Sequence, residues 1–218
     1  MEYKKEIIKR INSLSGSRSP YEVFCDWVKC CALSVQNNCD IFREKVWEKR
    51  EKEYLQTIER YGEGGKIFSE MFGLLTMALE SEITDVLGQI YMEGELGNKN
   101  TGQFFTPFHV SKACAQLVLT GEDGSRTIKM NEPSCGGGGM VIAAAAVLNE
   151  RGINYQRCLD VVAQDLDWKA VYMCYVQLSL LGIRATVVQG NTLEEPYGTK
   201  NADPERVFYT PRKVGLLL

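Results

Sequence analysis

The stretch TIKMNEPSCGGGGMVIAAAAVLNERGINYQRCLDVVAQD, residues 127–165, decides the fold of this chain. It places a short segment at 127–133 and a near-continuous apolar run at 159–165 on either side of an alanine-rich segment at 140–151. The two outer segments have the length of strands, and the alanine-rich segment has the composition of a helix. The stretch therefore predicts a strand–helix–strand unit, with a right-handed crossover between parallel strands.

The pattern continues beyond this unit. A helical segment at 168–181 precedes a third apolar run, RATVVQ, at 184–189. Upstream, residues 107–119 predict an amphipathic helix. Strands that are apolar throughout and alternate with helices are typical of a parallel sheet covered on both faces. We therefore expect an α/β domain over residues 101–218.

Residues 1–96 predict helices only, with breaks at 13–20 and at the glycines of 62–65. Ser19 and Pro20 predict the start of the second helix, as a serine cap followed by proline at the first helical position. No catalytic group of residues stands out before residue 100. We expect residues 1–100 to form a helical region that packs on the sheet domain and contacts partners.

Composition restricts the classes of function. The net charge of −3 argues against a broad basic surface for nucleic acid, so any affinity for DNA would be local or come from a partner. The N-terminus lacks the apolar core of a signal peptide, and no 18 apolar residues run together. We expect a cytoplasmic protein without a membrane span. The 8 cysteines form no CxxC pair and His109 is the sole histidine, which favours small buried side chains over a metal site or disulfides.

Four consecutive glycines, Gly136 to Gly139, lie between the first strand and its helix. Glycines let the backbone approach a ligand closely, and the N–H groups at a helix start point outward. In an open parallel sheet, ligands bind beyond the carboxyl ends of the strands. A flexible turn explains the glycines about equally well, so this loop alone predicts little.

Asp165 strengthens the interpretation because it ends the second strand, where a carboxylate can accept hydrogen bonds from two ribose hydroxyls. The alternative role is a helix cap, which we assign to Asp167 instead. A nicotinamide cofactor is disfavoured: no GxGxxG pattern occurs, and Asp165 lies 29 residues after Gly136 rather than the typical ~20. Glu132 would also repel a pyrophosphate and suits a cationic amino-acid group. A nucleoside that carries an amino acid fits these residues better.

Several motifs occur together and in order. They are DVLGQIY at 85–91, GQFFTP at 102–107, EPSCGGGG at 132–139, the strand end QD at 164–165 and GNTL at 190–193. In this arrangement the chain resembles the modification (methyltransferase) subunits of type I restriction systems and related N-6 adenine-specific DNA methylases, over roughly residues 67–193. The resemblance implies a Rossmann-like S-adenosylmethionine-dependent methyltransferase sheet, preceded by an all-helical N-terminal region.

The resemblance also implies a set of residues that bind S-adenosylmethionine: Phe105, Thr106, Pro107, Glu132, Gly136, Gly138, Asp165 and Asn191. The first three would lie beside the methionine end, and Glu132 would meet the amino group. The two glycines would permit close approach, and Asp165 would take the ribose. Asn191 stands where the family usually has an aspartate that contacts the adenine, and its amide can both donate and accept hydrogen bonds.

The family's catalytic loop, Asn/Asp-Pro-Pro-Phe/Tyr, holds a flipped adenine, and no such tetrapeptide occurs in this sequence. The nearest candidates are EPY at 195–197 and YTP at 209–211, which we interpret as ordinary loop or strand residues. After Asn191 the chain leaves no room for the last strands of a full methyltransferase sheet, so we expect a truncated sheet. Residues 214–218 (VGLLL) are candidates for an inner strand or a partner contact.

The leading hypothesis is a protein of DNA modification that binds S-adenosylmethionine and does not transfer a methyl group by itself. The resemblance implies DNA and a specificity-type subunit as partners. The residues themselves lead us to expect neither a membrane nor a metal ion. An inactive methyltransferase-like module that serves regulation or protein interaction is the alternative. In one version of this alternative, the glycine loop has lost its ligand and the helical region provides the surface that binds a protein partner. A nicotinamide oxidoreductase ranks third.

Overall fold

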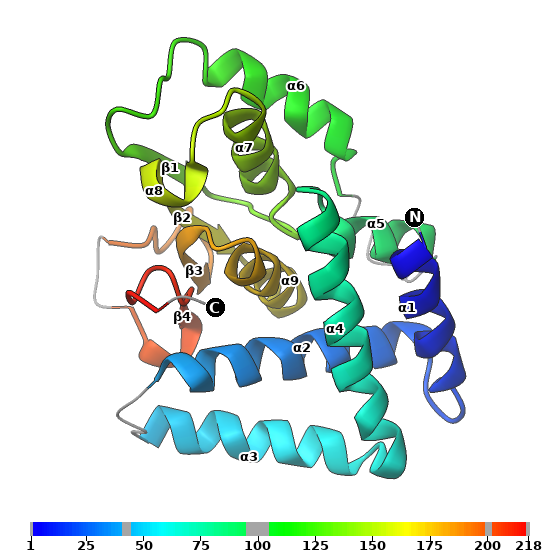
Figure 1. Ribbon diagram of the computed structural model, residues 1–218. Coiled ribbons are helices and arrows are strands. Elements are labelled where there is room, and N and C mark those ends of the chain that lie inside the picture. The colour runs from blue at the N-terminus through cyan, green and yellow to red at the C-terminus, as the bar shows by residue number, and fades with distance from the viewer. Residues whose placement is uncertain (1, 41–44, 95–104, 199–201, 217–218) are drawn as a thin grey trace.

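The computed structural model describes residues 2–40, 45–94, 105–198 and 202–216 (Figure 1). In chain order the elements are α1 (Glu2–Ser13), α2 (Pro20–Cys39), α3 (Lys45–Glu59), the short 3-10 helix η1 (Gly62–Gly64), α4 (Gly65–Ser81), α5 (Val86–Glu93), α6 (Phe108–Val118), β1 (Ile128–Glu132), α7 (Gly139–Glu150), α8 (Tyr155–Cys158), β2 (Leu159–Asp165), α9 (Trp168–Leu180), β3 (Arg184–Gln189), the 3-10 helix η2 (Pro204–Arg206) and β4 (Val207–Tyr209).

The strands form one sheet in the order β1-β2-β3-β4. β1 pairs with β2, and β2 with β3, in parallel, which confirms the predicted α/β class. Glu132 lies opposite Ala163, and Asp165 lies opposite Gln189, so the carboxyl ends of the three strands meet at one edge. This edge is where a parallel sheet places a ligand.

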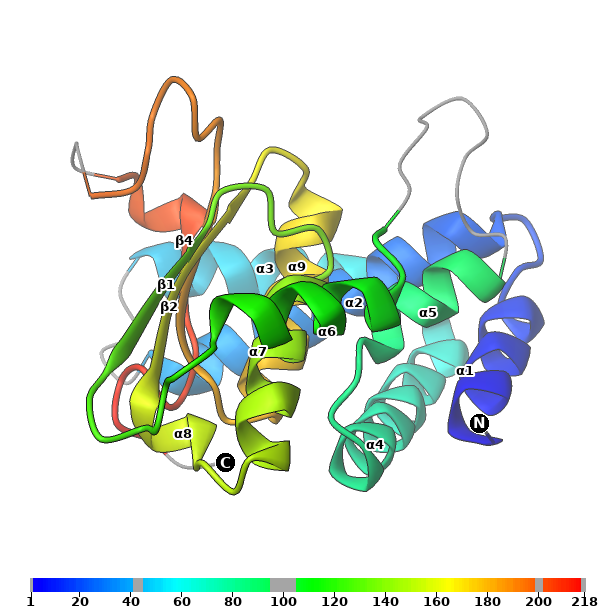
Figure 2. The ribbon, with the colours of Figure 1, turned by 90° about the horizontal axis from the view of Figure 1, so that it is seen from above.

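The expectation that helices cover both faces of the sheet is wrong for the described residues. The crossovers from β1 to β2 and from β2 to β3 advance in the same direction, so two right-handed crossovers place α7 and α9 on the same face. Figure 2 shows both helices on one side of the strands. Val161 and Val187 point to one face of the sheet and belong to the core. Lys129 and Asn131 of β1 point to the other face and are exposed.

The helical region forms as predicted, and α2 begins at the expected position. The Ser19 hydroxyl oxygen accepts a hydrogen bond from the Glu22 N–H at 3.2 Å, and the Ser19 N–H donates to the Glu22 carboxylate at 2.7 Å. These two bonds make a capping box, which satisfies N–H groups that a helix start would otherwise leave unpaired. The preceding break at residues 13–20 is thus a turn between α1 and α2.

α2 packs along α9 and connects the helical region to the sheet domain (Figure 1). A hydrophobic cluster runs through both regions and includes Trp27 and Phe24 of α2 as well as Tyr175 of α9, all fully buried. The Trp27 indole N–H donates to the Phe68 carbonyl oxygen of α4 at 3.1 Å. The helices before residue 100 therefore support the sheet from the side that carries α9.

β4 was not expected from the sequence. It runs antiparallel to β3, with Val207 opposite Val188 and Tyr209 opposite Thr186. The buried Thr210 hydroxyl then accepts from the Ala185 N–H at 2.9 Å and donates to the Ile183 carbonyl oxygen at 2.8 Å. The inner strand considered for residues 214–218 does not form over 214–216, where the chain turns; residues 217–218 lie outside the described ranges.

All eight cysteines carry free thiols, and Cys30, Cys31, Cys135, Cys158 and Cys174 are buried. Among the helices of the described ranges, none is long and apolar enough to cross a membrane.

Candidate cofactor site

The loop between β1 and α7 folds over the carboxyl end of β2. The Cys135 N–H donates to the Gln164 carbonyl oxygen at 3.0 Å, and the Gly136 N–H donates to the Asp165 carboxylate at 2.8 Å. The Thr192 hydroxyl, which lies beyond β3, donates to the Pro133 carbonyl oxygen at 2.7 Å. These bonds bring the loop, β2 and the segment after β3 to one edge of the sheet, as the sequence predicts.

A cavity of 380 Å³ lies against this loop. Its lining consists of Asp85, Phe105, Thr106, Ser111, Ser134, Cys135, Gly136, Gly137, Gly139, Met140 and Asp165. Phe105, Thr106, Gly136 and Asp165 are thus brought together, as expected for residues of one site. Pro107, Glu132, Gly138 and Asn191 are not part of the lining. Residues 102–104 of the GQFFTP motif lie outside the described ranges.

The Asp165 carboxylate is held in place by the backbone. Its Oδ2 accepts from the Gly136 N–H at 2.8 Å, and its Oδ1 accepts from the Asp167 N–H at 3.0 Å. A carboxylate has about four acceptor positions, so both oxygens can accept a further bond from a ligand hydroxyl. Asp167 caps α9 instead, by accepting from the Lys169 N–H at 2.9 Å. The assignment of a helix-cap role to Asp167 is confirmed.

The two predicted glycines differ in what they face. Gly136 has φ +52°, and a Cβ on it would lie 3.0 Å from the Phe105 ring, at the wall of the cavity. Gly138 has φ +93°, and a Cβ there would lie 3.2 Å from the Cys174 sulfur and 3.4 Å from the Cys174 Cα. Gly136 therefore lets the loop pack closely against the Phe105 ring, whereas Gly138 lets the loop pack on α9.

Replacing Gly138 with alanine is expected to lower the free energy of unfolding by about 2–4 kcal/mol. The left-handed backbone costs a residue with a Cβ roughly 1–2 kcal/mol, and the contact with Cys174 adds overpacking. Gly152→Ala is the matched control, because Gly152 has φ +74° and nothing within 4 Å of the added Cβ. Urea unfolding followed by circular dichroism measures both. Equal losses in the two variants would show that packing on α9 does not matter.

Glu132 ends β1 but does not line the cavity. Burial raises the pKa of its carboxyl group, and the nearby negative charge of Asp165 raises it further. Its Oε1 accepts from the Ser134 N–H at 3.4 Å. Asn191 lies just beyond β3, and its side-chain oxygen accepts from the Leu193 N–H at 3.0 Å. Both side chains thus serve the turns at the sheet edge.

Asp85 was not assigned a role from the sequence, although the DVLGQIY motif contains it. It caps α5, and its Oδ1 accepts from the Gly88 N–H at 2.9 Å. The residue is 4% exposed, lines the cavity, and burial raises the pKa of its carboxyl group. The match of this motif to the family pattern was the signal that could have identified it.

Gln177 of α9 holds Asp85 beside the glycine loop. Its side-chain nitrogen donates to Asp85 Oδ1 and to the Gly137 carbonyl oxygen, each at 2.8 Å. Its side-chain oxygen accepts from the Leu87 N–H at 2.9 Å. One fully buried amide therefore joins α5, α9 and the glycine loop. A glutamine within an apolar helix gave no sequence signal for this role.

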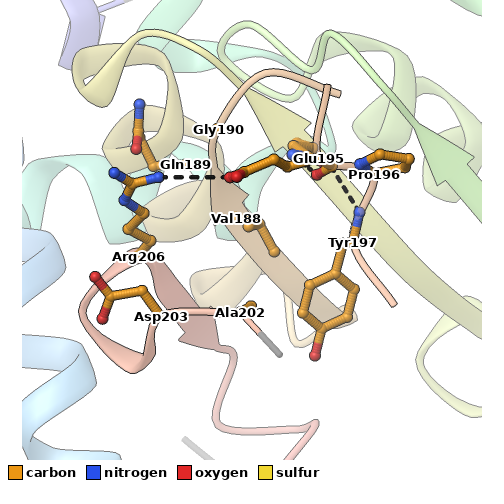
Figure 3. A pocket seen from close by; sticks show the side chains of 10 residues that line it. Val188, Gln189, Gly190, Glu195, Pro196, Tyr197, Ala202, Asp203 and Arg206 are labelled. Carbon is orange, nitrogen blue, oxygen red and sulfur yellow. Dashed lines mark hydrogen bonds and ion pairs between the residues drawn. The ribbon is translucent and has the colours of Figure 1, made fainter. Parts of the chain in front are cut away.

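A second cavity, of 280 Å³, lies between the segment after β3 and η2 and shares no lining residue with the first (Figure 3). The side-chain amide of Gln164 holds this segment in place. Its nitrogen donates to the Glu195 carbonyl oxygen at 3.0 Å, and its oxygen accepts from the Tyr197 N–H at 3.1 Å. Arg206 reaches Glu195 at 3.8 Å across this cavity. Residues 195–197 are thus loop residues, as interpreted from the sequence.

Tyr209 of the second candidate tripeptide ends β4 opposite Thr186, and Thr210 is bonded near the start of β3. Residues 209–211 therefore lie toward the opposite end of β3 from Asn191. This placement agrees with their interpretation as strand and loop residues.

A family model described as N-6 DNA Methylase matches residues 83–211, which is more than half of the chain. The type I restriction enzyme MjaIX methylase subunit of Methanocaldococcus jannaschii is 29% identical over 125 residues, covering 53% of this chain and 21% of that protein.

Two solved structures are also similar. One is a Listeria monocytogenes protein described as a class I S-adenosylmethionine-dependent methyltransferase, with TM-score 0.52 and 14% identity, covering 93% of this chain and 56% of that one. The other is a type I restriction-modification system methyltransferase subunit from Streptococcus thermophilus, with TM-score 0.46 and 18% identity, covering 91% and 41%. The chain thus spans about a fifth of the curated relative, a little over half of the first solved chain and about two fifths of the second.

Proposed function

The chain belongs to the N-6 DNA methylase family and has the fold of S-adenosylmethionine-dependent methyltransferases, and from this premise we propose that it binds S-adenosylmethionine in the 380 Å³ cavity. The observation that supports the proposal best is the meeting of the Asp165 carboxylate, the glycine loop and Phe105 around one space. These groups come from three segments of the chain.

The residues present suit this cofactor. Asp165 would accept hydrogen bonds from the ribose hydroxyls, because its oxygens keep free acceptor positions. Gly136 would let the backbone approach the ligand beneath Phe105.

The charges of the site also suit a cationic ligand. Asp85 and Asp165 line the cavity and Glu132 lies beside Asp165, and no ion pair joins any of the three to a cationic side chain of the described residues. S-adenosylmethionine supplies an electrophilic methyl group on a positively charged sulfur when bound. A carboxylate-rich wall would stabilise that charge in a partly desolvated cavity.

Phe105 and Thr106 would close the cavity at the start of α6. The Phe105 ring packs edge-on against Tyr91 of α5 at 5.1 Å, and the Tyr91 hydroxyl accepts from the Lys169 ammonium group at 3.1 Å. α5 and α9 therefore fix the position of the ring. A fixed aromatic wall would exclude water from one side of the bound cofactor.

We further propose that the methyl group acceptor is an adenine amino group in DNA and that the chain works with a specificity-type subunit. The family and the type I restriction name of the curated relative support this proposal. Residues 1–218 contain no Asn/Asp-Pro-Pro-Phe/Tyr tetrapeptide, so the groups that hold the base would come from outside these residues. With a net charge of −3, much of the contact with DNA would also come from a partner.

Calorimetric titration of the purified chain with S-adenosylmethionine tests the cofactor proposal, and we expect saturable binding together with an increased Tm. In parallel, radiolabelled cofactor and unmethylated duplex DNA are expected to give no methyl transfer with this chain alone. Transfer by the chain alone would contradict the dependence on outside residues. No heat and no thermal shift, with the chain folded by circular dichroism, would instead support the interaction module whose loop has lost its ligand.

A further inference from the structure

Three polar features meet where α7 begins at the cavity wall. A Cβ on Gly139 would lie 3.2 Å from Asp85 Oδ2 and 3.9 Å from the Ser111 hydroxyl oxygen. Asp85, Ser111 and Gly139 all line the cavity, and they come from the start of α5, from α6 and from the start of α7. Residues from three helices thus form one polar corner of the cavity.

Asp85 contributes a buried carboxylate with unused capacity in this corner. Its Oδ1 is occupied by the Gly88 N–H and by Gln177, whereas its Oδ2 has no hydrogen-bond partner within the described parts of the chain. No cationic side chain among the same residues pairs with it. A buried carboxylate without a counter-charge is costly, and burial accordingly raises its pKa. A cationic ligand would remove this cost.

Ser111 contributes an unpartnered hydroxyl. The residue is fully buried, and its oxygen has no hydrogen-bond partner among the described residues. The start of α7, a helix of 12 residues, lies beside this hydroxyl. Its N-cap residue, Gly138, has no side chain that could accept hydrogen bonds from the first N–H groups of the helix. The first N–H groups of a helix have no partner within the helix and carry partial positive charge. The hydroxyl and these N–H groups together suit a carboxylate.

We propose that this corner binds the zwitterionic amino-acid end of the cofactor, with Asp85 on its ammonium group and Ser111 and the start of α7 on its carboxylate. The inference rests on the proposed binding of S-adenosylmethionine. It moves the ammonium contact from Glu132, which the family resemblance implied, to Asp85. Glu132 does not line the cavity, and its carboxylate accepts from the Ser134 N–H. The adenosine end then lies toward Asp165.

A comparison of two ligands tests this assignment by calorimetry on the whole chain. S-adenosylhomocysteine carries the amino-acid end and a neutral sulfur, whereas methylthioadenosine has the same adenosine and a neutral sulfur but lacks the amino acid. Asp85→Asn keeps an acceptor for Gly88 and Gln177 but removes the charge. We expect it to weaken S-adenosylhomocysteine about 10-fold to 100-fold and to leave methylthioadenosine within about twofold.

Ser111→Ala is the second variant, and it should fold normally because it removes an unpaired buried hydroxyl. We expect it to weaken S-adenosylhomocysteine about 5-fold to 10-fold and to leave methylthioadenosine unchanged. Glu132→Gln is the matched control, which should change the ratio of the two affinities by less than about threefold.

Each outcome decides the assignment. Equal weakening of both ligands by Asp85→Asn, with no selective effect of Ser111→Ala, would show that Asp85 only caps α5. A selective loss in Glu132→Gln would return the ammonium contact to Glu132. If wild-type protein binds methylthioadenosine and S-adenosylhomocysteine with equal affinity, the assignment of this corner to the amino-acid end is wrong. The proposed cofactor site itself would not be contradicted. If it binds neither ligand nor S-adenosylmethionine, the proposed function fails as well.

Discussion

Replacing Gln177 with methionine is expected to lower the free energy of unfolding by about 3–5 kcal/mol and the Tm by roughly 10 °C. Methionine has a similar length and removes both polar atoms. The Leu87 N–H and the Gly137 carbonyl oxygen would lose their partner, and Asp85 would lose one of its two donors. Each buried group left unpaired costs about 1–3 kcal/mol, and a buried carboxylate is at the upper end.

Gln116→Met is the control for this change, because Gln116 lies on the exposed surface of α6 and its side chain makes none of the hydrogen bonds of the described residues. It should alter the free energy of unfolding by less than about 0.5 kcal/mol. Chemical unfolding of both variants, followed by tryptophan fluorescence, measures the difference. A loss below about 1 kcal/mol in Gln177→Met would mean that water or rearrangement satisfies the three groups.

The second large effect concerns ligand affinity. Asp165→Ala is expected to weaken binding of S-adenosylmethionine at least about 100-fold, because it removes the proposed ribose acceptors and also the carboxylate that holds the Gly136 N–H. Asp165→Asn keeps one acceptor oxygen and should weaken binding about 10-fold. The graded losses distinguish a direct contact from a general disturbance of the loop.

Asp160→Ala is the matched control for Asp165→Ala. Asp160 lies near the opposite end of the same strand and pairs with Lys213 at 2.7 Å, away from the cavity. Asp160→Ala should leave the affinity for the cofactor within about twofold of the wild-type value. It should lower the free energy of unfolding by about 1 kcal/mol or less. Calorimetric titration of the three variants measures the affinities. Comparable weakening in Asp160→Ala and Asp165→Ala would remove the argument for a ribose contact.

Gln177 joins α5 to the glycine loop, and Asp165 holds the same loop from the end of β2. The family match spans all of these elements. That match begins at residue 83, just before Asp85, and not at the predicted domain start at residue 101. Asp85, the N-cap of α5, lines the cavity although this helix precedes the sheet in the chain. The boundary placed between residues 100 and 101 stays a prediction.

The local sequence was sufficient to predict those elements that depend only on residues adjacent in the chain. β2 and β3 have the predicted ends, because continuous apolar runs bounded by polar residues specify a buried strand. Ser19 and Pro20 marked the start of α2, because a cap depends on residues within one turn. The position of Asp165 beside the glycine loop followed from strand order alone, since parallel strands end at one edge.

Other features depend on contacts between distant residues, and only the tertiary structure decided them. Asp85 and Gln177 are 92 positions apart, and neither local periodicity nor composition reports their hydrogen bond. The strand β4 is three residues long and forms because β3 offers it an edge. An added Cβ on Gly138 would meet Cys174 of α9, which only the packing of α9 decides, and the close approach of Gly138 to a cofactor stays a prediction.

The sequence by itself determined the α/β sheet, the glycine loop and its acidic partner Asp165, because each follows from the period and order of nearby residues. The tertiary structure decided which side chains line the cavity. It brought in Asp85 and Ser111 and left out Glu132 and Asn191. The physical reason is that a cavity wall is made by side chains from separate helices, whose packing depends on the whole hydrophobic core.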